Sequence, residues 1–239
     1  MATISLSTRD EERAASSPVA LPRAIIFDWD NTLVDSWGAI SEAINFIRAR
    51  YGLQTWNHDE ILANCTRSAR ESFPEWFGDK WQTAWTEYYD YFMKVRQRAG
   101  INKAYGATEF LLWLKDVHIP AMVVSNKSGD ILRQEAAMLD WSQYFISIVG
   151  AHDAPRDKPS RDPVDKALLM AGLENGGDIW FIGDSESDVV CARASECTPV
   201  LIGEPLKAKT LGVDIVFKDC LTALNYLKGL VLAQEVVDG

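Results

Sequence analysis

Short apolar runs that end in small or polar residues recur along most of the chain. The first, Ala24–Phe27, is rich in β-branched and aromatic residues and ends at Asp28, a pattern typical of a buried parallel strand. Similar runs occupy residues 121–124, 146–149, 179–182 and 199–202. Segments with helical periodicity separate the runs, at residues 107–117, 131–139, 164–171 and 189–194. This alternation predicts an α/β fold with a doubly wound, mostly parallel sheet.

One long stretch breaks the alternation. Between residues 36 and 103 no strand-like run occurs, and helical patterns are found instead near residues 39–50 and 80–98. Aromatic residues are dense in this stretch, which favours a small helical bundle with an aromatic core. We therefore expect residues 36–103 to form an inserted helical cap. The catalytic core would then consist of residues 21–35 and 104–239, preceded by a flexible tail at residues 1–20.

The composition is that of an ordinary folded protein. Apolar residues make up 47% of the 239 residues and charged residues 24%, and the length suffices for a core domain with a smaller inserted one. The formal net charge of -10 disfavours nucleic acid as a partner, because an acidic surface repels the phosphate backbone. The sequence leaves a monomer and a homodimer equally open.

The chain carries no signal that points to a membrane or to secretion. No segment approaches the roughly 18 consecutive apolar residues of a membrane span, and acids at positions 10–12 interrupt the start, against a targeting peptide. The four cysteines show no C-x-x-C spacing, which favours buried thiols in a reducing compartment; they are Cys65, Cys191, Cys197 and Cys220. We expect a cytoplasmic protein with no membrane partner.

Two carboxylates follow the first predicted strand. Asp28 and Asp30 are separated by one residue, and ligands of open α/β sheets bind beyond the carboxyl ends of strands. Two neighbouring acids repel each other unless a cation joins them, and oxygen ligands suit Mg²⁺. With that cation present, Asp28 could attack a phosphate as a nucleophile. Asp30 is near enough to protonate the leaving oxygen and then to activate water.

The decapeptide from Phe27 to Ser36 resembles the first motif of the haloacid dehalogenase superfamily, D-x-D-G-T-L-x-D-S. Three further motifs of that family follow in order: Ser125-Asn126 after a strand, Lys158 in a loop before a helix, and Gly183-Asp184-Ser185-Glu186-Ser187-Asp188 after a strand. The resemblance extends from Ala24 to about Leu227. One departure is Asn31, which stands where the family has Gly, and we expect a left-handed backbone there that Asn tolerates.

The resemblance implies a magnesium-dependent phosphatase that forms a phospho-aspartate on Asp28. It implies that Asp28, Asp30 and Asp184 hold Mg²⁺, and that Asp188 holds Lys158 or a water beside the metal. A phosphate group would be bound by Thr32, Ser125, Asn126 and Lys158. The acid at Asp30 separates this chain from the dehalogenases proper, which lack it. The absence of Lys between residues 36 and 70 argues against the phosphonoacetaldehyde hydrolase branch.

The helical insert resembles the cap of the phosphoglycolate phosphatase-like branch, most clearly over residues 67–81. A small phosphorylated metabolite, such as 2-phosphoglycolate, is the substrate that this branch implies. Arg67 and Arg70 are the candidates for selecting it, since Arg can clamp a carboxylate with two donors. Two alternatives stay open: a sugar phosphomutase of the same superfamily, and a non-catalytic member that binds or regulates.

Overall fold

A computed structural model of the chain describes residues 20–65 and 67–238, so the predicted tail lies outside the described residues except for Ala20. The predicted α/β architecture is confirmed. Six strands form one sheet in the order β5-β4-β1-β6-β7-β8, and every neighbouring pair runs parallel. The strands are β1 Ala24–Phe27, β4 Ala121–Ser128, β5 Ser147–Ala151, β6 Ile179–Gly183, β7 Thr198–Ile202 and β8 Ile215–Phe217.

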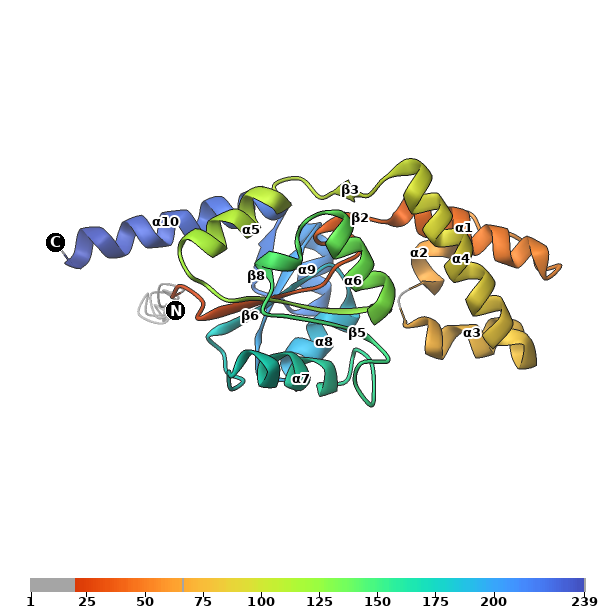
Figure 1. Cartoon of the computed structure of the whole chain (residues 1–239). Helices are drawn as coiled ribbons and strands as arrows, with labels where there is room; N and C mark the ends of the chain where they lie inside the picture. The colour runs from red at the N-terminus through yellow and green to blue at the C-terminus, as the bar shows by residue number, and fades with distance from the viewer. Residues whose placement is uncertain (1–19, 66, 239) are drawn as a thin grey trace, which may run out of the picture.

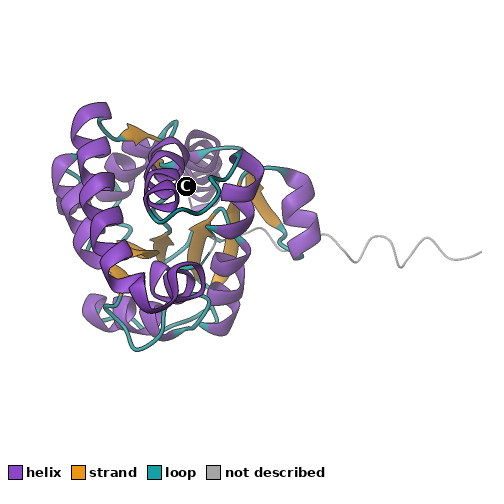
Figure 2. Cartoon of the chain, turned by 90° about the vertical axis from the view of Figure 1, so that its right-hand side faces the viewer, coloured by secondary structure: helices purple, strands orange, loops and turns teal. Residues whose placement is uncertain are grey.

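Helices cover both faces of this sheet (Figure 2). One face packs against α5 Ala107–Asp116, α6 Gly129–Met138 and α10 Cys220–Asp238, and the other against α7 Asp162–Ala171 and α8 Glu186–Ala194. The short helix α9 Pro205–Leu211 packs beside β7 and β8, and the 3₁₀ turn η3 spans Ser142–Tyr144.

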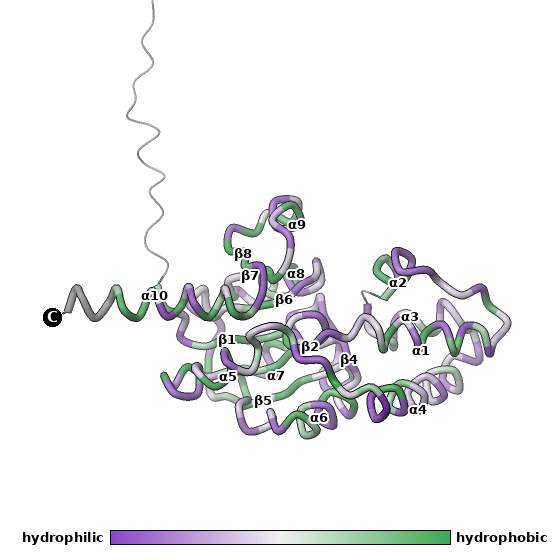
Figure 3. Tube along the Cα trace, turned by 90° about the horizontal axis from the view of Figure 1, so that it is seen from above, coloured by the Kyte–Doolittle hydropathy of each residue, from purple (hydrophilic) through white to green (hydrophobic). Residues whose placement is uncertain are grey.

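The buried strand β1 divides its side chains between the two faces. Ile25 and Phe27 belong to the cluster under α5, α6 and α10, whereas Ala24 and Ile26 belong to the cluster under α7 and α8. All four residues are fully buried, which explains why the strand reads as a continuous apolar run. The central strands are coloured as hydrophobic along most of their length in Figure 3, while the surrounding helices alternate.

The stretch between β2 Val34–Asp35 and β3 Asn102–Lys103 is helical and lies at one end of the molecule (Figure 1). We call its helices the cap: α1 Trp37–Arg50, α2 His58–Asn64, α3 Ala69–Phe77, η2 Gly78–Lys80 and α4 Trp81–Ala99. An aromatic core fills it, with the Phe73 ring 5.1 to 5.5 Å from the rings of Trp76, Phe77, Trp85 and Tyr88. The division into a cap and a core that act as separate units stays a prediction.

The two connections between cap and core run side by side. β2 Val34–Asp35 leads into the cap and β3 Asn102–Lys103 leads out of it, and the two strands pair antiparallel with Val34 opposite Lys103 and Asp35 opposite Asn102. The chain therefore enters and leaves the cap at one narrow point, shortly after β1.

The four cysteines form no disulfide; Cys191, Cys197 and Cys220 are buried and Cys65 is half-buried, as expected of thiols. Within residues 20–65 and 67–238, no helix is both long and apolar enough to cross a membrane.

Candidate active site

Three neighbouring strands deliver the predicted site residues to one edge of the sheet. β1 lies between β4 and β6, with Phe27 in register with Val123 on one side and with Ile182 on the other. The residues that follow these positions are therefore brought together: Asp28 after β1, Ser125 in β4, and Asp184 after β6. The sheet order reverses direction at β1, and such a switch point is where open α/β sheets bind ligands.

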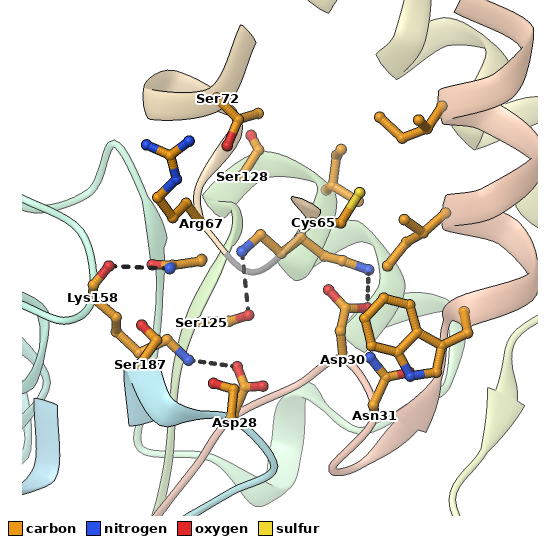
Figure 4. Close-up of a pocket in the computed structure, with 18 of the residues that line it drawn as sticks. Asp28, Asp30, Asn31, Cys65, Arg67, Ser72, Ser125, Ser128, Lys158 and Ser187 are labelled. Atoms are coloured by element: carbon orange, nitrogen blue, oxygen red, sulfur yellow. Dashed lines mark hydrogen bonds and ion pairs between the residues drawn. The ribbon is translucent and has the colours of Figure 1, made fainter. Parts of the chain in front are cut away.

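Asp28 is paired with the predicted lysine. The Nζ of Lys158 lies 2.7 Å from Asp28 Oδ1 and 2.6 Å from Asp188 Oδ1, and the Lys158 side chain is only 3% exposed. Figure 4 shows Lys158 reaching from its own loop to the Asp28 carboxylate. The lysine therefore fixes the orientation of Asp28 and supplies a positive charge beside it.

The loop after β6 is built around Asp188. Its Oδ2 accepts hydrogen bonds from the backbone N–H of Asp184 at 3.1 Å, and from the N–H and hydroxyl of Ser185 at 2.9 and 2.6 Å. Ser185 in turn caps α8 through the Asp188 N–H. A Cβ on Gly183 would collide with the Asp188 side chain, so this position requires glycine.

The acids beside Asp28 favour a cation. Ligand oxygens of Asp28, Asp184 and Asp188 lie within 4.8 Å of one another. Burial raises the pKa of Asp28 to about 6, Lys158 opposing and Asp188 adding to the effect. Burial, followed by Asp188 and Asp28, raises the pKa of Asp184 to about 8.

Burial alone would lower the pKa of Lys158, but Asp188 and Asp28 together raise it above its ordinary value. The three carboxylates and this one ammonium carry a net charge of about -2 when all are ionised. A buried group of that charge is stabilised by a divalent cation, and carboxylate oxygens are the ligands that Mg²⁺ prefers. The residues therefore fit a magnesium ion, and the place of Asp30 at the metal stays a prediction.

Asp30 lies in a second, separate cluster of charges. Its Oδ1 is 2.7 Å from the Nζ of Lys127, and the same Nζ is 2.7 Å from Glu135 Oε2. Glu135 is fully buried on α6, and Lys127 is 5% exposed. Glu135 also accepts a hydrogen bond from Trp29 Nε1 at 2.7 Å. The carboxylate of Asp30 is thus held by a lysine that is itself held in the core.

The cap reaches into the same cluster through Arg96, near the end of α4. Arg96 Nε lies 2.7 Å from Glu135 Oε1, and its Nη2 donates to the hydroxyl of Ser36, where the cap begins. Arg96 is 3% exposed on its side chain. The two acids Asp30 and Glu135 are therefore balanced by Lys127 and Arg96, in one buried network that joins the site to the cap.

Sequence reasoning missed Lys127, Glu135 and Arg96. The sequence does contain a signal for Glu135 and Arg96, since each lies on the apolar face of a helix. Glu135 lies beside Leu132 and Ala136, and Arg96 follows Phe92 and Val95. A charge on such a face must find a buried partner.

The remaining predicted phosphate-binding residues divide in two. Ser125 and Asn126 line the cavity, and Asn126 Nδ2 donates to the backbone carbonyl of Lys158 at 3.1 Å. Thr32 is fully buried in the turn after Asp30 and is not among the residues that line the cavity. Asn31 has φ of 63°, which confirms the predicted left-handed backbone.

The two cap arginines are both engaged with acids. Arg67 lines the cavity, and its guanidinium makes a two-point ion pair with Glu75, at 2.8 and 2.5 Å. Arg70 does not line the cavity; its Nη2 lies 2.8 Å from the buried Asp157 Oδ1, in the loop of Lys158. Arg70 therefore bridges cap and core rather than facing a ligand.

Known proteins resemble this chain over most of its length. Residues 25–202 match the family model described as haloacid dehalogenase-like hydrolase. A phosphoglycolate phosphatase from Chromobacterium violaceum is 28% identical over 218 residues, covering 86% of this chain and 96% of that protein.

Two solved structures are similar in fold. A predicted phosphoglycolate phosphatase from Haemophilus somnus has a TM-score of 0.75 at 20% identity, covering 87% of this chain and 98% of that one. A variant of CbbY from Rhodobacter sphaeroides, in complex with xylulose-(1,5)bisphosphate, has a TM-score of 0.74 at 16% identity, covering 84% and 95%. At these identities the two structures support the fold.

Proposed function

This chain belongs to the haloacid dehalogenase-like hydrolases and is a hydrolase of the phosphatase type, and on that premise we propose that it hydrolyses a small phosphomonoester through a phospho-aspartate on Asp28, with Mg²⁺ as cofactor. One observation carries this proposal: Asp28 is buried at the end of the central strand, held by Lys158 and grouped with Asp184 and Asp188. The names of the relatives make 2-phosphoglycolate the first ester to test. The expected cytoplasmic location is part of the same proposal.

Mg²⁺, when bound, would be held by Asp28 and Asp184, with Asp188 beside it, and would neutralise the phosphate so that an anionic carboxylate can approach it. The sequence also places Asp30 in the metal set; its side chain is paired with Lys127, and its contact with the metal stays a prediction. Lys158 adds a second positive charge at the phosphate, and the Ser125 hydroxyl and Asn126 offer hydrogen bonds to its oxygens.

The chain's own residues then divide the reaction into two steps. Asp28 attacks phosphorus, the bond from phosphorus to the leaving oxygen breaks, and Asp30, which enters this step as the protonated acid, gives that oxygen its proton. Asp30 next takes a proton from water, whose oxygen attacks the phosphorus. The bond from phosphorus to Asp28 breaks, which releases inorganic phosphate and restores both carboxyl groups to their starting states.

The sugar-phosphomutase and non-catalytic alternatives have weaker support. A mutase must bind many sugar hydroxyls, and the cap side of the cavity is largely apolar. A protein that had lost catalysis would have no need for the paired contacts of Lys158 with Asp28 and Asp188.

Phosphate release from a panel of small esters tests the proposal. Wild type should release phosphate only with Mg²⁺, and Asp28→Ala should lose this activity while remaining folded, as circular dichroism would show. Asp35→Ala, on the exposed edge of β2, is the matched control and should keep it. Retained activity in Asp28→Ala would rule out the phospho-aspartate, and mass spectrometry after acid quenching should find the phosphate on the peptide that contains Asp28.

A further inference from the structure

The cavity above Asp28 is lined on one side by cap residues that have no role in binding the phosphate. It measures about 280 Å³, near the lower end of the roughly 300–1,000 Å³ typical of ligand pockets. Catalytic residues form its floor, and apolar cap residues form the opposite wall; among them are Trp37, Leu62, Phe73, Trp76, Trp85 and Phe92. Figure 4 shows Cys65 and Ser72 of the cap facing Asp28 and Ser125 across this space.

Two of the cations that line the cavity, Arg67 and Lys127, are already paired with acids. Arg67 is held by Glu75, and Lys127 is held by Asp30 and Glu135. Lys207 lines the cavity too, but it is exposed on α9 and acts on Asp184, on the metal side. A carboxylate on the leaving group would therefore meet no unpaired cation on the described part of the cap wall.

The hydroxyl of Ser72 on this wall has no hydrogen-bond partner among the described residues. The Ser72 hydroxyl is buried, the residue being 1% exposed, and within the described residues it makes no hydrogen bond. A buried hydroxyl without a partner costs free energy, and a ligand atom that bonds it removes that cost. The wall is therefore suited to an apolar group that carries a polar atom within reach of the Ser72 hydroxyl.

We infer that the leaving group of the substrate is an uncharged alcohol with an apolar part the size of an aromatic ring, rather than glycolate. The inference rests on the phosphatase function proposed above. An aromatic or aliphatic ring would bury its surface against the tryptophans and Phe73, which is favourable. The carboxylate of glycolate would lose its hydration against the same wall without forming an ion pair in exchange. Such desolvation of a charged group costs free energy.

A comparison of benzyl phosphate with 2-phosphoglycolate tests this inference. Both esters release an alcohol, so that a difference in kcat/KM reflects recognition of the leaving group. Acetyl phosphate, which is small and reactive, reports whether the site transfers phosphate at all. We expect kcat/KM for benzyl phosphate to exceed that for 2-phosphoglycolate by roughly tenfold or more, the discrimination that apolar pockets give to small apolar groups.

A charge added to the wall should change this preference. Leu62 is half-buried on α2 and lines the cavity. Leu62→Arg should lower kcat/KM for benzyl phosphate and raise it for 2-phosphoglycolate, on the order of tenfold in each direction. Leu169→Arg places the same side chain at a position that is 79% exposed on α7, outside the cavity, and should change neither value.

The outcomes separate the inference from the function on which it rests. One outcome is that acetyl phosphate is hydrolysed in an Asp28-dependent way and that kcat/KM for 2-phosphoglycolate equals or exceeds that for benzyl phosphate. This outcome would overturn the inference and leave the phosphatase proposal standing. An unchanged preference in Leu62→Arg would also overturn it. No turnover of any of the three esters would overturn the proposed function, and the inference with it.

Discussion

Lys127 determines how the carboxylate of Asp30 is oriented. It contacts both Asp30 and the buried Glu135, so replacing it frees the carboxylate to rotate. We expect Lys127→Met to lower kcat for alkyl phosphates about ten- to a hundredfold, a part of the roughly 10²–10⁴ that a positioned acid contributes.

The leaving group distinguishes this role from phosphate binding. An ester of p-nitrophenol needs no acid to expel its leaving group, so Lys127→Met should affect its kcat far less than that of an alkyl ester. Equal losses for both esters would show that Lys127 binds the phosphate instead.

Asp184 makes the stability of the metal-free protein depend on pH. Its pKa is about 8 in the folded protein against 3.8 for an ordinary aspartate. Between these values the folded state binds more protons than the unfolded state, so the free energy of unfolding falls as pH rises. In EDTA, Asp184→Asn should therefore gain stability relative to wild type as pH rises through this window, as measured by urea unfolding.

Asp162→Asn is the control for that experiment. The pKa of Asp162 is lowered to about 2, first by its hydrogen bond with Arg156. Its stabilising contribution is lost only as pH falls from 3.8 towards that value, so the difference between Asp162→Asn and wild type should stay constant at higher pH. A constant difference for Asp184→Asn as well would contradict the raised pKa.

The sequence indicated the main site residues because motif and fold coincide at them. Asp28 and Asp184 follow the apolar strands β1 and β6, Ser125 follows the apolar run that opens β4, and the carboxyl ends of adjacent parallel strands meet. The ion pair of Asp30 with Lys127 was not predictable from the sequence. Side-chain partners across the core have no local signature in the sequence.

At the scale of elements, α4 carries two arginines that differ only in their surroundings. Arg96 is 3% exposed and paired with the buried Glu135, whereas Arg98 is 65% exposed and paired with Glu42. Breaking a buried pair leaves an uncompensated charge and typically costs about 3–5 kcal/mol, while an exposed pair contributes roughly 0–1 kcal/mol.

We therefore expect Arg96→Met to lower the free energy of unfolding by about 3 kcal/mol or more, and Arg98→Met to change it by less than about 1 kcal/mol. Both variants replace the same side chain on the same helix, two positions apart. Urea unfolding measures the two changes, and equal effects would mean that the buried network adds nothing to the attachment of the cap.

Elements with strong periodicity were predicted well, and short ones were missed. The predicted strand at Ala24–Phe27 matches β1, and the helix predicted at residues 80–98 corresponds to α4 Trp81–Ala99. β2 and β3 have two residues each, and β8 has three that are only half-buried. Segments of this length carry no readable alternation, because their pairing is decided by what the rest of the fold places beside them.

At the scale of the whole molecule, the excess of acidic residues means that Mg²⁺ binding should raise the stability of the folded protein. The net charge is -10, and three acids meet at the site. A ligand that binds only the folded state raises stability by mass action, by about 2.7 kcal/mol at one hundred times its dissociation constant. Mg²⁺ at that concentration should stabilise wild type by this amount against NaCl of equal ionic strength. An equal gain in Asp184→Asn would place the ion elsewhere.

The paired connections β2 and β3 have a consequence for the order of folding. The central strand β1 is synthesised early, but its partners β4 and β6 come after the whole cap: Ile25 pairs with Ala121 and Trp180. Helical contacts within the cap are local and form fast, while the pairing of distant strands is slow. The chain leaves the core and returns to it through the paired strands β2 and β3. The two ends of the cap segment therefore lie side by side, and the cap is a continuous insertion in the chain. We therefore expect the cap to fold during synthesis, before β4 and β6 have been made and can pair with β1.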